Sequence, residues 1–498
     1  MVYIGFDIGS SSVKAALLEV STGKCLGVVQ EPESEMGMIA HKNGWAEQHP
    51  EDWWNHVCTA SQKLLKTYNI SNEKVSGIGI SYQMHGLVVV DKEGKTLRPS
   101  IIWCDSRAVE IGNQGAKELG KDYCDHHLLN TPGNFTASKL KWVKENEPEL
   151  YQNIHKCMLP GDYISYRFSG EMNTTISGLS EGIFWDFKKE DISKSLMDNY
   201  ALEMDLIPER VPTFGLQGKV DEKGAAESGL AVGTPIFYRA GDQPNNALSL
   251  GVLNAGEVAA TAGTSGVVYA VTDSLLAKET SKINHFAHVN YAKGNPKIGK
   301  LLCINGVGIQ YRWLQANLEV ESYTQMNALA ESVPVGSEGL FVLPFGNGAE
   351  RMFENRQIGS HFLHLNLNVH NKAHLCRAAL EGIAFSFVYG MELLKKDGVN
   401  LSRIKAGNDN MFRSEIFADT ISTLLGIEIE IFATTGAIGA ARAAGLHSGD
   451  FETFRKNITD NDFDKRFVPQ KEKQELQKAY EAWKKELEAF TKRQETQS

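Results

Sequence analysis

The stretch that most constrains the fold runs from Gly233 to Gly251, because it places a carboxylate directly after a predicted buried strand. Residues 235–238 are apolar or aromatic and favour a strand, which stops at Ala240-Gly241-Asp242. The small residues that follow, Ala247 to Leu250, predict a helix. In open α/β sheets, ligands and reacting groups lie just beyond the carboxyl ends of the strands. Asp242 is therefore either a reacting group or the N-terminal cap of the next helix.

The length and composition predict a soluble protein of more than one domain. The chain has 498 residues, which exceeds what a single hydrophobic core usually supports. Its 42% hydrophobic and 22% charged residues are typical of globular proteins. A net charge of -10 disfavours binding to nucleic acid or to acidic membranes. No apolar run approaches about 20 residues, so we expect no membrane-spanning helix.

The cysteines and the N-terminus both favour a cytoplasmic location. None of the seven cysteines forms a CxxC pair, which argues against a zinc site or a disulfide framework. The N-terminal sequence MVYIGFDIG lacks a basic region followed by an apolar core, so we expect no signal peptide.

Two strand–turn–strand patterns suggest two related domains. In the first, a strand from Val2 to Ile8 leads through Gly9-Ser10-Ser11-Ser12 into a second strand that carries Lys14. In the other, a strand from Val258 to Ala262 leads into Gly263-Thr264-Ser265-Gly266 and another strand. Such turns present backbone N–H groups and hydroxyls that suit a polyphosphate, although a single one is more often a plain hairpin. The pair indicates two domains facing each other across a nucleotide, which we place at residues 1–250 and 251–450.

Polar side chains follow two further strands of the first domain. A strand from Val75 to Tyr82 stops at Gln83-Met84-His85-Gly86, and one from Thr96 to Trp103 precedes Cys104-Asp105-Ser106-Arg107. Polar side chains at these positions could bind a polyol. In the alternative interpretation, His85 is structural and Asp105 pairs with Arg107.

The second domain offers two candidate nucleotide contacts and a tail. A turn that enters a helix over Gly306–Leu314 includes Gln310, and a short strand ends at the loop Gly407-Asn408-Asp409-Asn410. Residues 451–498 form the predicted tail, in which helical spacing of Leu476, Tyr480 and Trp483 favours a helix docked on the second domain.

Several other segments have simpler interpretations. Lys372–Lys395 predicts a long core helix, and Gly436–Gly445 a closely packing Ala/Gly-rich helix. Gly178–Phe187 is predicted to be irregular, and Ile192–Met204 to be a helix.

Taken together, these stretches resemble the FGGY family of carbohydrate kinases, and most closely its members that phosphorylate xylulose. The resemblance covers nearly the whole chain, from Ile4 to about Gly445. The matching stretches include DIGSSSVKA (7–15), GWAEQHPEDWW (44–54), ISYQMHG (80–86), LRPSIIWCDSRA (97–108), AGDQPNNA (240–247), TAGTSG (261–266) and HLCRAALEGIAF (374–385).

The resemblance implies a fold of two ribonuclease-H-like α/β domains of the actin and sugar-kinase ATPase superfold, with an interdomain cleft. It implies that Asp242 is the general base and that Asp7 supports the phosphates and Mg²⁺. The sugar would contact Met84, His85, Asp242, Gln243, Trp103, Asp105 and Arg107. ATP would contact Gly9, Ser10, Ser11, Lys14, Gly263, Thr264, Ser265, Gly306, Gln310, Gly407, Asn408 and Asn410.

The implied activity is ATP-dependent phosphorylation of a ketopentose, D-xylulose at its terminal hydroxyl. The alternatives are another substrate of the family, such as ribulose, L-xylulose or glycerol, and a non-catalytic nucleotide switch of the same superfold. The chain departs from the family's glycine-rich adenine loop at Lys405-Ala406-Gly407 and the three residues that follow. A homodimer is a further expectation from the family.

Overall fold

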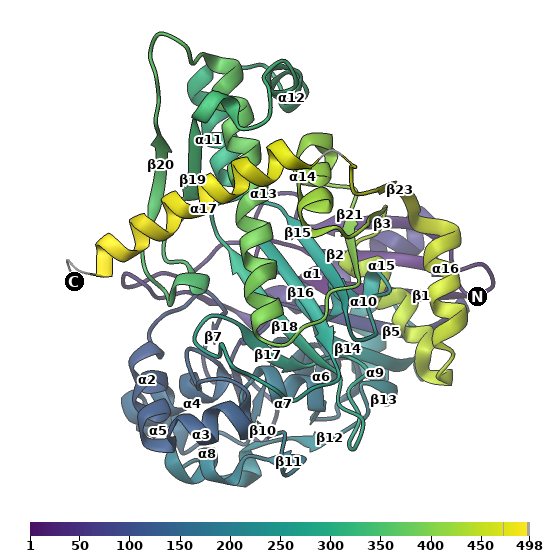
Figure 1. The fold of residues 1–498 in the computed structure, drawn as a ribbon. Coiled ribbons are helices and arrows are strands. Elements are labelled where there is room, and N and C mark those ends of the chain that lie inside the picture. Colours follow the sequence, from purple (N-terminus) through teal and green to yellow (C-terminus); the bar gives the residue numbers. More distant parts are fainter. Residues whose placement is uncertain (472, 496–498) are drawn as a thin grey trace.

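One mixed β-sheet forms the centre of each half of the protein (Figure 1). The structure is a computed structural model that describes residues 1–471 and 473–495. The first sheet has the order β13 (Phe214–Lys219), β14 (Pro235–Gly241), β5 (Val75–Tyr82), β1 (Val2–Ile8), β2 (Val13–Glu19) and β3 (Cys25–Glu31). The second has the order β17 (Asn284–Ala287), β18 (Ile298–Ile304), β16 (Gly266–Thr272), β15 (Glu257–Ala262), β21 (Arg403–Gly407), β22 (Ile429–Phe432) and β23 (Phe463–Phe467).

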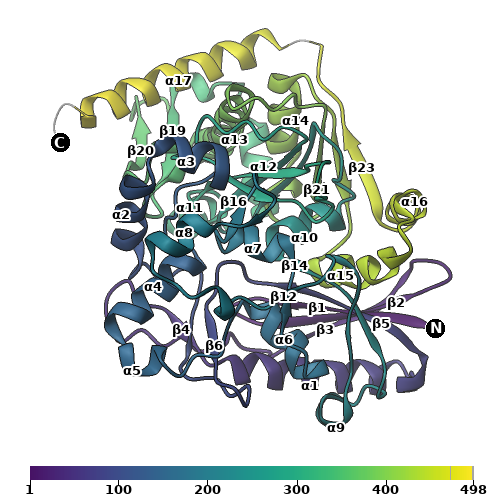
Figure 2. The same cartoon turned by 90° about the horizontal axis from the view of Figure 1, so that it is seen from below.

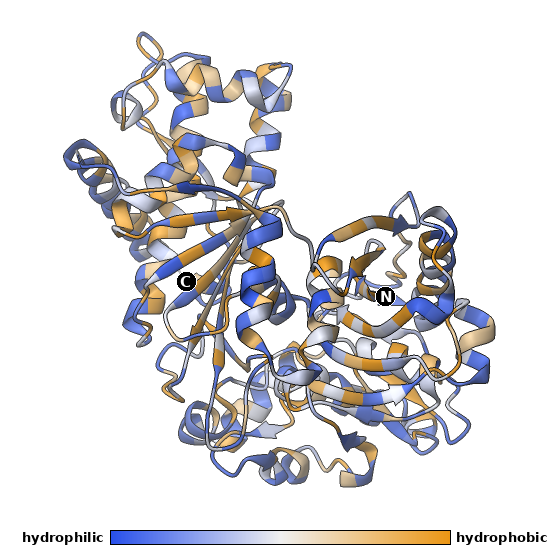
Figure 3. Ribbon diagram, turned by 90° about the vertical axis from the view of Figure 1, so that its right-hand side faces the viewer, coloured by the Kyte–Doolittle hydropathy of each residue, from blue (hydrophilic) through white to orange (hydrophobic). Residues whose placement is uncertain are grey.

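The two sheets share their central topology. In the first, β1 pairs with β5 and β5 with β14 in parallel, while β2 and β3 continue antiparallel. In the second, β15, β21 and β22 are likewise parallel, while β16 and β18 continue antiparallel. Orange segments in both sheets show where apolar residues build the strands (Figure 3). The expected architecture of two α/β halves is confirmed.

Two helices lie between the sheets: α10 (Asp242–Ser249) and α15 (Gly436–Ala443). Helix α15 belongs to the second half in sequence, but it packs directly on the first sheet (Figure 2). A Cβ at Gly5 would collide with the backbone of Ala437 and Ala441, and one at Gly79 with that of Ala440. Glycine is needed on β1 and β5 because the backbones of helix and strands touch.

The outer faces carry further helices. The first sheet is covered by α1 (Pro50–Thr67), α6 (Pro160–Ser169) and α9 (Glu222–Ser228), with Trp53 and Trp54 of α1 fully inside the core. The second sheet is covered by α13 (Lys372–Lys396) and α14 (Glu415–Leu425).

Two insertions extend the halves. The first holds α2 (Val109–Leu119), α3 (Lys121–Tyr123), α4 (Thr136–Asn146), α5 (Pro148–Tyr151), α7 (Ile176–Glu181) and α8 (Lys194–Asn199). Short strand pairs brace it: β4 (Glu47–Gln48) with β7 (Ser100–Ile101), β6 (Val88–Val90) with β8 (Lys156–Met158), β9 (Asn173–Thr174) with β12 (Glu209–Arg210), and β10 (Trp185–Asp186) with β11 (Asp191–Ile192). The other insertion holds α11 (Gly308–Leu318), α12 (Tyr323–Glu331), β19 (Phe341–Phe345) and β20 (Gly359–Leu363) and projects at the top of Figure 1.

Three expectations for the first half are wrong. The predicted strand from Thr96 to Trp103 is reduced to the two residues of β7. Residues 192–204 do not form one helix, because Ser193 caps the short helix α8, which ends at Asn199. Residues 178–187 are not irregular throughout, since they include most of α7 and the strand β10.

The C-terminal segment contains α16 (Phe451–Asp462), the edge strand β23 and α17 (Gln474–Glu495). Helix α17 crosses the second half, where Trp483 is fully buried and its indole N–H donates to the carbonyl of Val342 (Figure 1). The boundaries at residues 250 and 450 remain predictions. Among the described residues, no helix combines the length and apolar character needed to cross a bilayer.

Candidate active site

Three strands of the first sheet end side by side and bring two carboxylates to one edge. Asp7 on β1 and Ala240 on β14 both lie opposite Ser81 on β5. Because these strands are parallel, their carboxyl ends meet at the same edge, which is where open α/β sheets bind ligands. Asp242 follows β14 as the first residue of α10 and therefore lies at this edge as well.

Asp242 has the electrostatic character of a group that exchanges a proton near neutral pH. Burial and the neighbouring charge of Asp7 raise the pKa of Asp242 to about 7, although hydrogen bonds with Gln243 oppose the rise. The side chain remains partly accessible. Asp242 does not act as a helix cap through its side chain, because the cap position is Gly241.

Asp7 is held by the hydroxyl of Ser81, which donates to Oδ1 at 2.7 Å. Gly436, the first residue of α15, lies so close to the other carboxylate oxygen that a Cβ there would collide with it. Burial raises the pKa of Asp7, while Ser81 and Lys14 lower it. Helix α15 from the second half therefore begins at the Asp7 carboxylate of the first half.

The chemistry of Asp7 fits Mg²⁺ rather than a metal held by protein ligands alone. Among the residues that the structure describes, no group of three His, Cys, Asp or Glu side chains could hold a metal. Mg²⁺ is usually bound through one or two carboxylates together with substrate phosphates and water. Asp7 can supply such a carboxylate.

Met84 and His85 follow β5 and lie beside this edge. A Cβ at Gly241 would collide with Met84, so the strand end and this loop are in close contact. His85 adopts a left-handed backbone conformation, with φ of 62°. Its ring packs against Phe135 and against Phe286, which lies on β17 of the second sheet. Burial, and then the charge of Lys139, lower the pKa of His85 to about 3, so the imidazole is neutral.

Asp105 and Arg107 pair with each other. The Asp105 carboxylate is fully buried and accepts hydrogen bonds from the main chain and guanidinium of Arg107 and from the main chain of Ala46. The guanidinium of Arg107 also lies 3.7 Å from the centroid of the Trp45 ring. This geometry supports the structural alternative over sugar binding, because both side chains are almost completely buried among protein groups.

Trp103 differs from these two residues, since 54% of it is exposed. Its indole N–H lies 3.4 Å from the hydroxyl of Ser10, so the ring borders the first phosphate turn.

The two glycine- and hydroxyl-rich turns are ordered by their own backbones. The amide of Gly9 donates to the carbonyl of Ser12 at 3.0 Å, and Ser11 is exposed. In the second half, Gly308 at the start of α11 donates to the carbonyl of Gly263 at 2.9 Å, and Thr264 is exposed. Both turns therefore leave hydroxyl groups open to a ligand.

A cavity of about 790 Å³ adjoins the second turn between α11, α12 and α14. Of the expected nucleotide contacts, Gly263, Thr264 and Asn410 line it. Its other polar lining residues were missed in the sequence: Tyr311, Arg312, Ser322, Tyr323, Thr324, Asn327, Glu331, Arg413, Ser414 and Glu415. Asp242 is not part of this cavity.

Other expected nucleotide contacts lie elsewhere. Gly306 packs against the carbonyl of Pro344, and the side chain of Gln310 is buried and accepts a hydrogen bond from Ser360 at 2.7 Å. The side-chain amide of Asn408 donates to the carboxylate of Asp464. Ser265 and Gly407 also lie outside the lining of the cavity.

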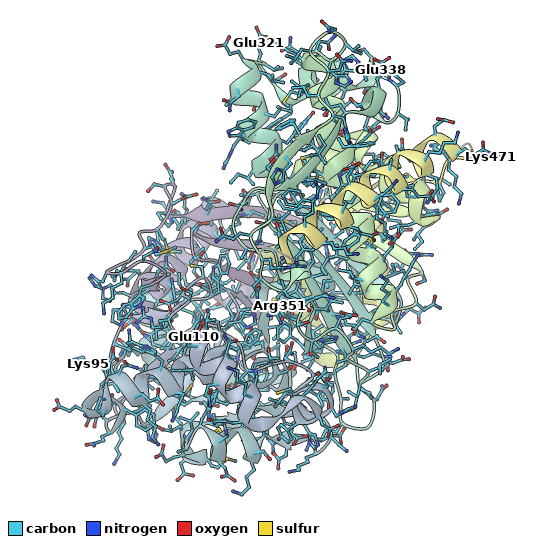
Figure 4. The ribbon with its side chains drawn as sticks, turned by 60° about the vertical axis from the view of Figure 1, so that its left-hand side comes forward. Lys95, Glu110, Glu321, Glu338, Arg351 and Lys471 are labelled. Carbon is cyan, nitrogen blue, oxygen red and sulfur yellow. The ribbon has the colours of Figure 1, made fainter. Side chains whose placement is uncertain are left out.

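Two charged groups of the second half, Glu350 and Arg351, lie close enough to Cys303 to act on its thiol, as does Asp242. Glu350 is fully buried and accepts from the main chain of Asn305 at 3.0 Å, and burial raises the pKa of Glu350 to about 7. The neighbouring Arg351 lies in the middle of the molecule, whereas Glu321 and Glu338 lie on the projecting insertion (Figure 4).

The fold and the site together define the superfold of sugar kinases and actin-like ATPases. The two sheets share the same central strand order, two helices lie between them, and carboxylates lie at the strand ends. The family model for the N-terminal domain of the FGGY family of carbohydrate kinases matches residues 2–249, and that for its C-terminal domain matches residues 258–448. The chain therefore belongs to the FGGY family of carbohydrate kinases, and it is an enzyme.

Its relatives include proteins named xylulose kinase. That of Bacillus subtilis (strain 168) is 28% identical over 462 residues, which cover 91% of this chain and 89% of the relative. That of Haemophilus influenzae is 29% identical over 471 residues, which cover 91% and 93%.

Solved structures with the same fold include kinases that are named for different substrates. Xylulose kinase from Rhodospirillum rubrum superimposes with a TM-score of 0.88 at 25% identity, over 99% of this chain and 100% of that one. Plasmodium falciparum glycerol kinase with ADP gives a TM-score of 0.87 at 18% identity over 98% of each chain, which shows the shared fold alone.

Proposed function

We propose that this enzyme transfers the terminal phosphoryl group of ATP to a ketopentose, D-xylulose, to give D-xylulose 5-phosphate. The observation that carries the proposal is the Asp242 carboxylate at the end of β14, beside Asp7 and with a pKa raised to about 7. A base of that pKa is well matched to proton transfer at neutral pH. The choice of xylulose is supported by relatives that bear the name xylulose kinase over nearly their whole length.

In the proposed reaction, the oxygen of the sugar hydroxyl forms the new bond to phosphorus while Asp242 accepts the proton of that hydroxyl. The bond between that phosphorus and the bridging oxygen breaks, and ADP leaves. Phosphoryl transfer asks the protein mainly to position the reactants and to stabilise charge. When bound, Mg²⁺ would neutralise phosphate charge, and Asp7 is the residue that would hold it.

The nucleotide would occupy the cavity beside α11, with its phosphates directed at the turns that contain Ser11 and Thr264. Those turns come from opposite halves, so closure of the halves would exclude water that competes as a nucleophile.

Replacing Asp242 tests the proposed base. Asp242→Ala should lower turnover by at least about 100-fold and leave ATP binding nearly unchanged. Turnover should be followed by coupled ADP release and binding by calorimetry. A variant that works at nearly the wild-type rate would show that Asp242 is not the base.

A substrate screen tests the proposed sugar. The same assay across D-xylulose, L-xylulose, ribulose, gluconate and glycerol should give the highest kcat/KM with D-xylulose. ATP consumption that does not depend on any sugar would instead favour a nucleotide switch. We also propose that the enzyme is cytoplasmic and that it forms a homodimer. Light scattering on the purified protein would test the homodimer.

A further inference from the structure

Glu181 is a buried carboxyl group next to the proposed base that the reaction above does not use. It is the last residue of α7 and is only 2% exposed. Both of its carboxyl oxygens lie near Gly241, the residue before Asp242. Burial raises the pKa of Glu181 well above its usual range, and the charge of Asp242 raises it further. A buried carboxyl group with a raised pKa therefore lies under the edge of the site.

Glu181 holds His85 at two points. Its Oε2 accepts the main-chain N–H of His85 at 3.2 Å, and its main-chain carbonyl lies 3.0 Å from Nδ1 of the imidazole. From the other side, Nζ of Lys139 donates to the carbonyl of His85 at 2.8 Å. These contacts restrain a non-glycine residue in the left-handed region, which is otherwise disfavoured.

The contacts of Nδ1 determine where the ring proton lies. Nδ1 faces the carbonyl oxygen of Glu181 at 3.0 Å and its Oε2 at 3.6 Å, and the carbonyl can only accept. The neutral imidazole must therefore carry its hydrogen on Nδ1, which leaves a lone pair on Nε2. Within the described part of the chain, no group forms a hydrogen bond with Nε2, and the side chain is 15% exposed.

The helix that carries Glu181 is fixed to both halves. Thr175 caps it by accepting the N–H of Gly178 at 3.0 Å. One residue before Glu181, the hydroxyl of Ser180 accepts the N–H of Ala287 on β17 at 2.8 Å. The position of Glu181 is therefore set by the second sheet as well as by the first half.

We propose that Glu181 is a positioning residue: its carboxyl group holds the backbone of His85 so that the ring donates Nδ1–H to the main-chain carbonyl of Glu181, and Nε2 then accepts a hydrogen bond from a substrate hydroxyl. The proposal rests on the proposed function, since it assumes that His85 faces the sugar. It also restricts the substrate class: a hydroxyl group can donate to Nε2, whereas a carbonyl or carboxylate oxygen at that position would face a lone pair. The substrate is then a neutral polyhydroxyl compound at this end.

The tautomer can be measured in the free enzyme by ¹⁵N NMR with ring-labelled histidine, using His85→Asn to assign the signal. The wild type should show a neutral ring protonated on Nδ1. Glu181→Ala keeps that main-chain carbonyl but releases the backbone of His85, so the ring should move away from the carbonyl and give a mixture of tautomers. Glu181→Gln, whose amide oxygen can still accept the N–H of His85, should keep the wild-type signal. A wild-type ring protonated on Nε2, or on both nitrogens at pH 7, would overturn the proposal.

Steady-state kinetics provide a second test, besides the NMR experiment. Glu181→Ala should raise KM for the best sugar on the order of 10-fold, and Glu181→Gln should stay within about 3-fold of wild type. The matched control is Glu381→Gln, because Glu381 is also 2% exposed and accepts a main-chain N–H, from Gly336, in the second half. That variant should change neither the His85 signal nor KM.

The two arms separate the two proposals. If no sugar is phosphorylated by the wild type, the proposed function fails while the NMR result still decides the tautomer. If the sugar is phosphorylated but Glu181→Ala leaves both the tautomer and KM unchanged, the role of Glu181 is wrong.

Discussion

The two halves of the protein repeat one topology but differ in charge where their strands end. Strands β1, β2, β5 and β14 of the first sheet correspond in order and direction to β15, β16, β21 and β22 of the second. The first half has Asp7 next to the last residue of β1, and Asp242 at the start of the following central helix. At the corresponding places the second half has Thr261 and Gly436.

This difference shows how a repeated fold can divide its tasks. Burial raises the pKa of both carboxyl groups of the first half, and the charge of Asp7 raises that of Asp242 further, so the pair suits proton transfer and cation binding. The second half has uncharged residues at the two corresponding positions, Thr261 and Gly436, and instead forms the cavity beside α11. The predictions below test that division.

The largest expected effect concerns stability in the second half. Asp397 is fully buried, and its Oδ2 accepts from His285 at 2.7 Å and from Lys300 at 2.6 Å. Asp397→Asn should lower the free energy of unfolding by about 3–5 kcal/mol, because it leaves a buried lysine without its counter-charge. Urea denaturation measures this change.

Acid provides a check of the same cluster. Although burial opposes it, hydrogen bonds from His285 and Lys300 hold the pKa of Asp397 well below its usual range. The stabilisation is therefore present above the unfolded-state pKa of about 4 and is lost as the pH falls towards the folded value. The exposed pair of Asp198 with Lys194 is the control, and Asp198→Asn should cost less than about 1 kcal/mol. Equal costs for the two variants would contradict the prediction.

The next effect tests the asymmetry at the strand ends directly. Asp7→Asn should lower kcat by roughly 100-fold, since a charged group at the phosphate and cation site is removed. Thr261→Val, at the corresponding position of the second half, should change kcat by less than about 3-fold. Steady-state assays measure kcat for both variants. Similar losses of kcat would mean that the strand ends of the two halves contribute equally to catalysis.

A smaller effect is expected in the pH dependence. Because burial and Asp7 raise the pKa of Asp242 to about 7, kcat/KM for the sugar should fall about 10-fold per pH unit below 7 and level off above it. Asp7→Asn should move the midpoint to lower pH, whereas Thr261→Val should not move it. A profile that is flat from pH 5 to 8 would rule out Asp242 as the titrating base.

The smallest effect concerns the cavity of the second half. The Tyr311 hydroxyl donates to Asn327 at 3.0 Å, and both residues line the cavity. Tyr311→Phe should raise KM for ATP by about 2- to 10-fold, the value of one hydrogen bond, and leave KM for the sugar unchanged. An increase in the sugar KM instead would place the sugar in this cavity.

Local patterns explain what could be predicted from the sequence. Strands β1 and β14 have apolar runs that stop at Gly9 and Gly241. Asp242 follows its strand directly, so its position could be predicted from neighbouring residues alone. The placement of Asp7 and Asp242 at one edge then follows from parallel pairing.

The features that were missed depend on contacts between distant segments. The sequence places Asp105 and Arg107 after a predicted strand like the other candidates, but Trp45 and Glu47 come from a segment far away in the sequence and enclose them. Gln310 lies on the expected helix, yet neighbouring residues on a helix point about 100° apart, and Tyr311 faces the cavity in its place.

Glu181 was missed for a similar reason. Residues 178–187 show no clear period, and the carboxyl group gains its role only through His85 and Gly241, which lie far away in the sequence.

The contact of α15 with Gly5 and Gly79 bears on how the chain acquires its structure. A ribosome releases β1 and β5 long before it makes the helix that covers them, so the nascent first sheet must keep one face uncovered until the chain is nearly complete. Cutting the gene between its two halves should then yield an N-terminal fragment that aggregates, and supplying the missing half in trans should rescue it.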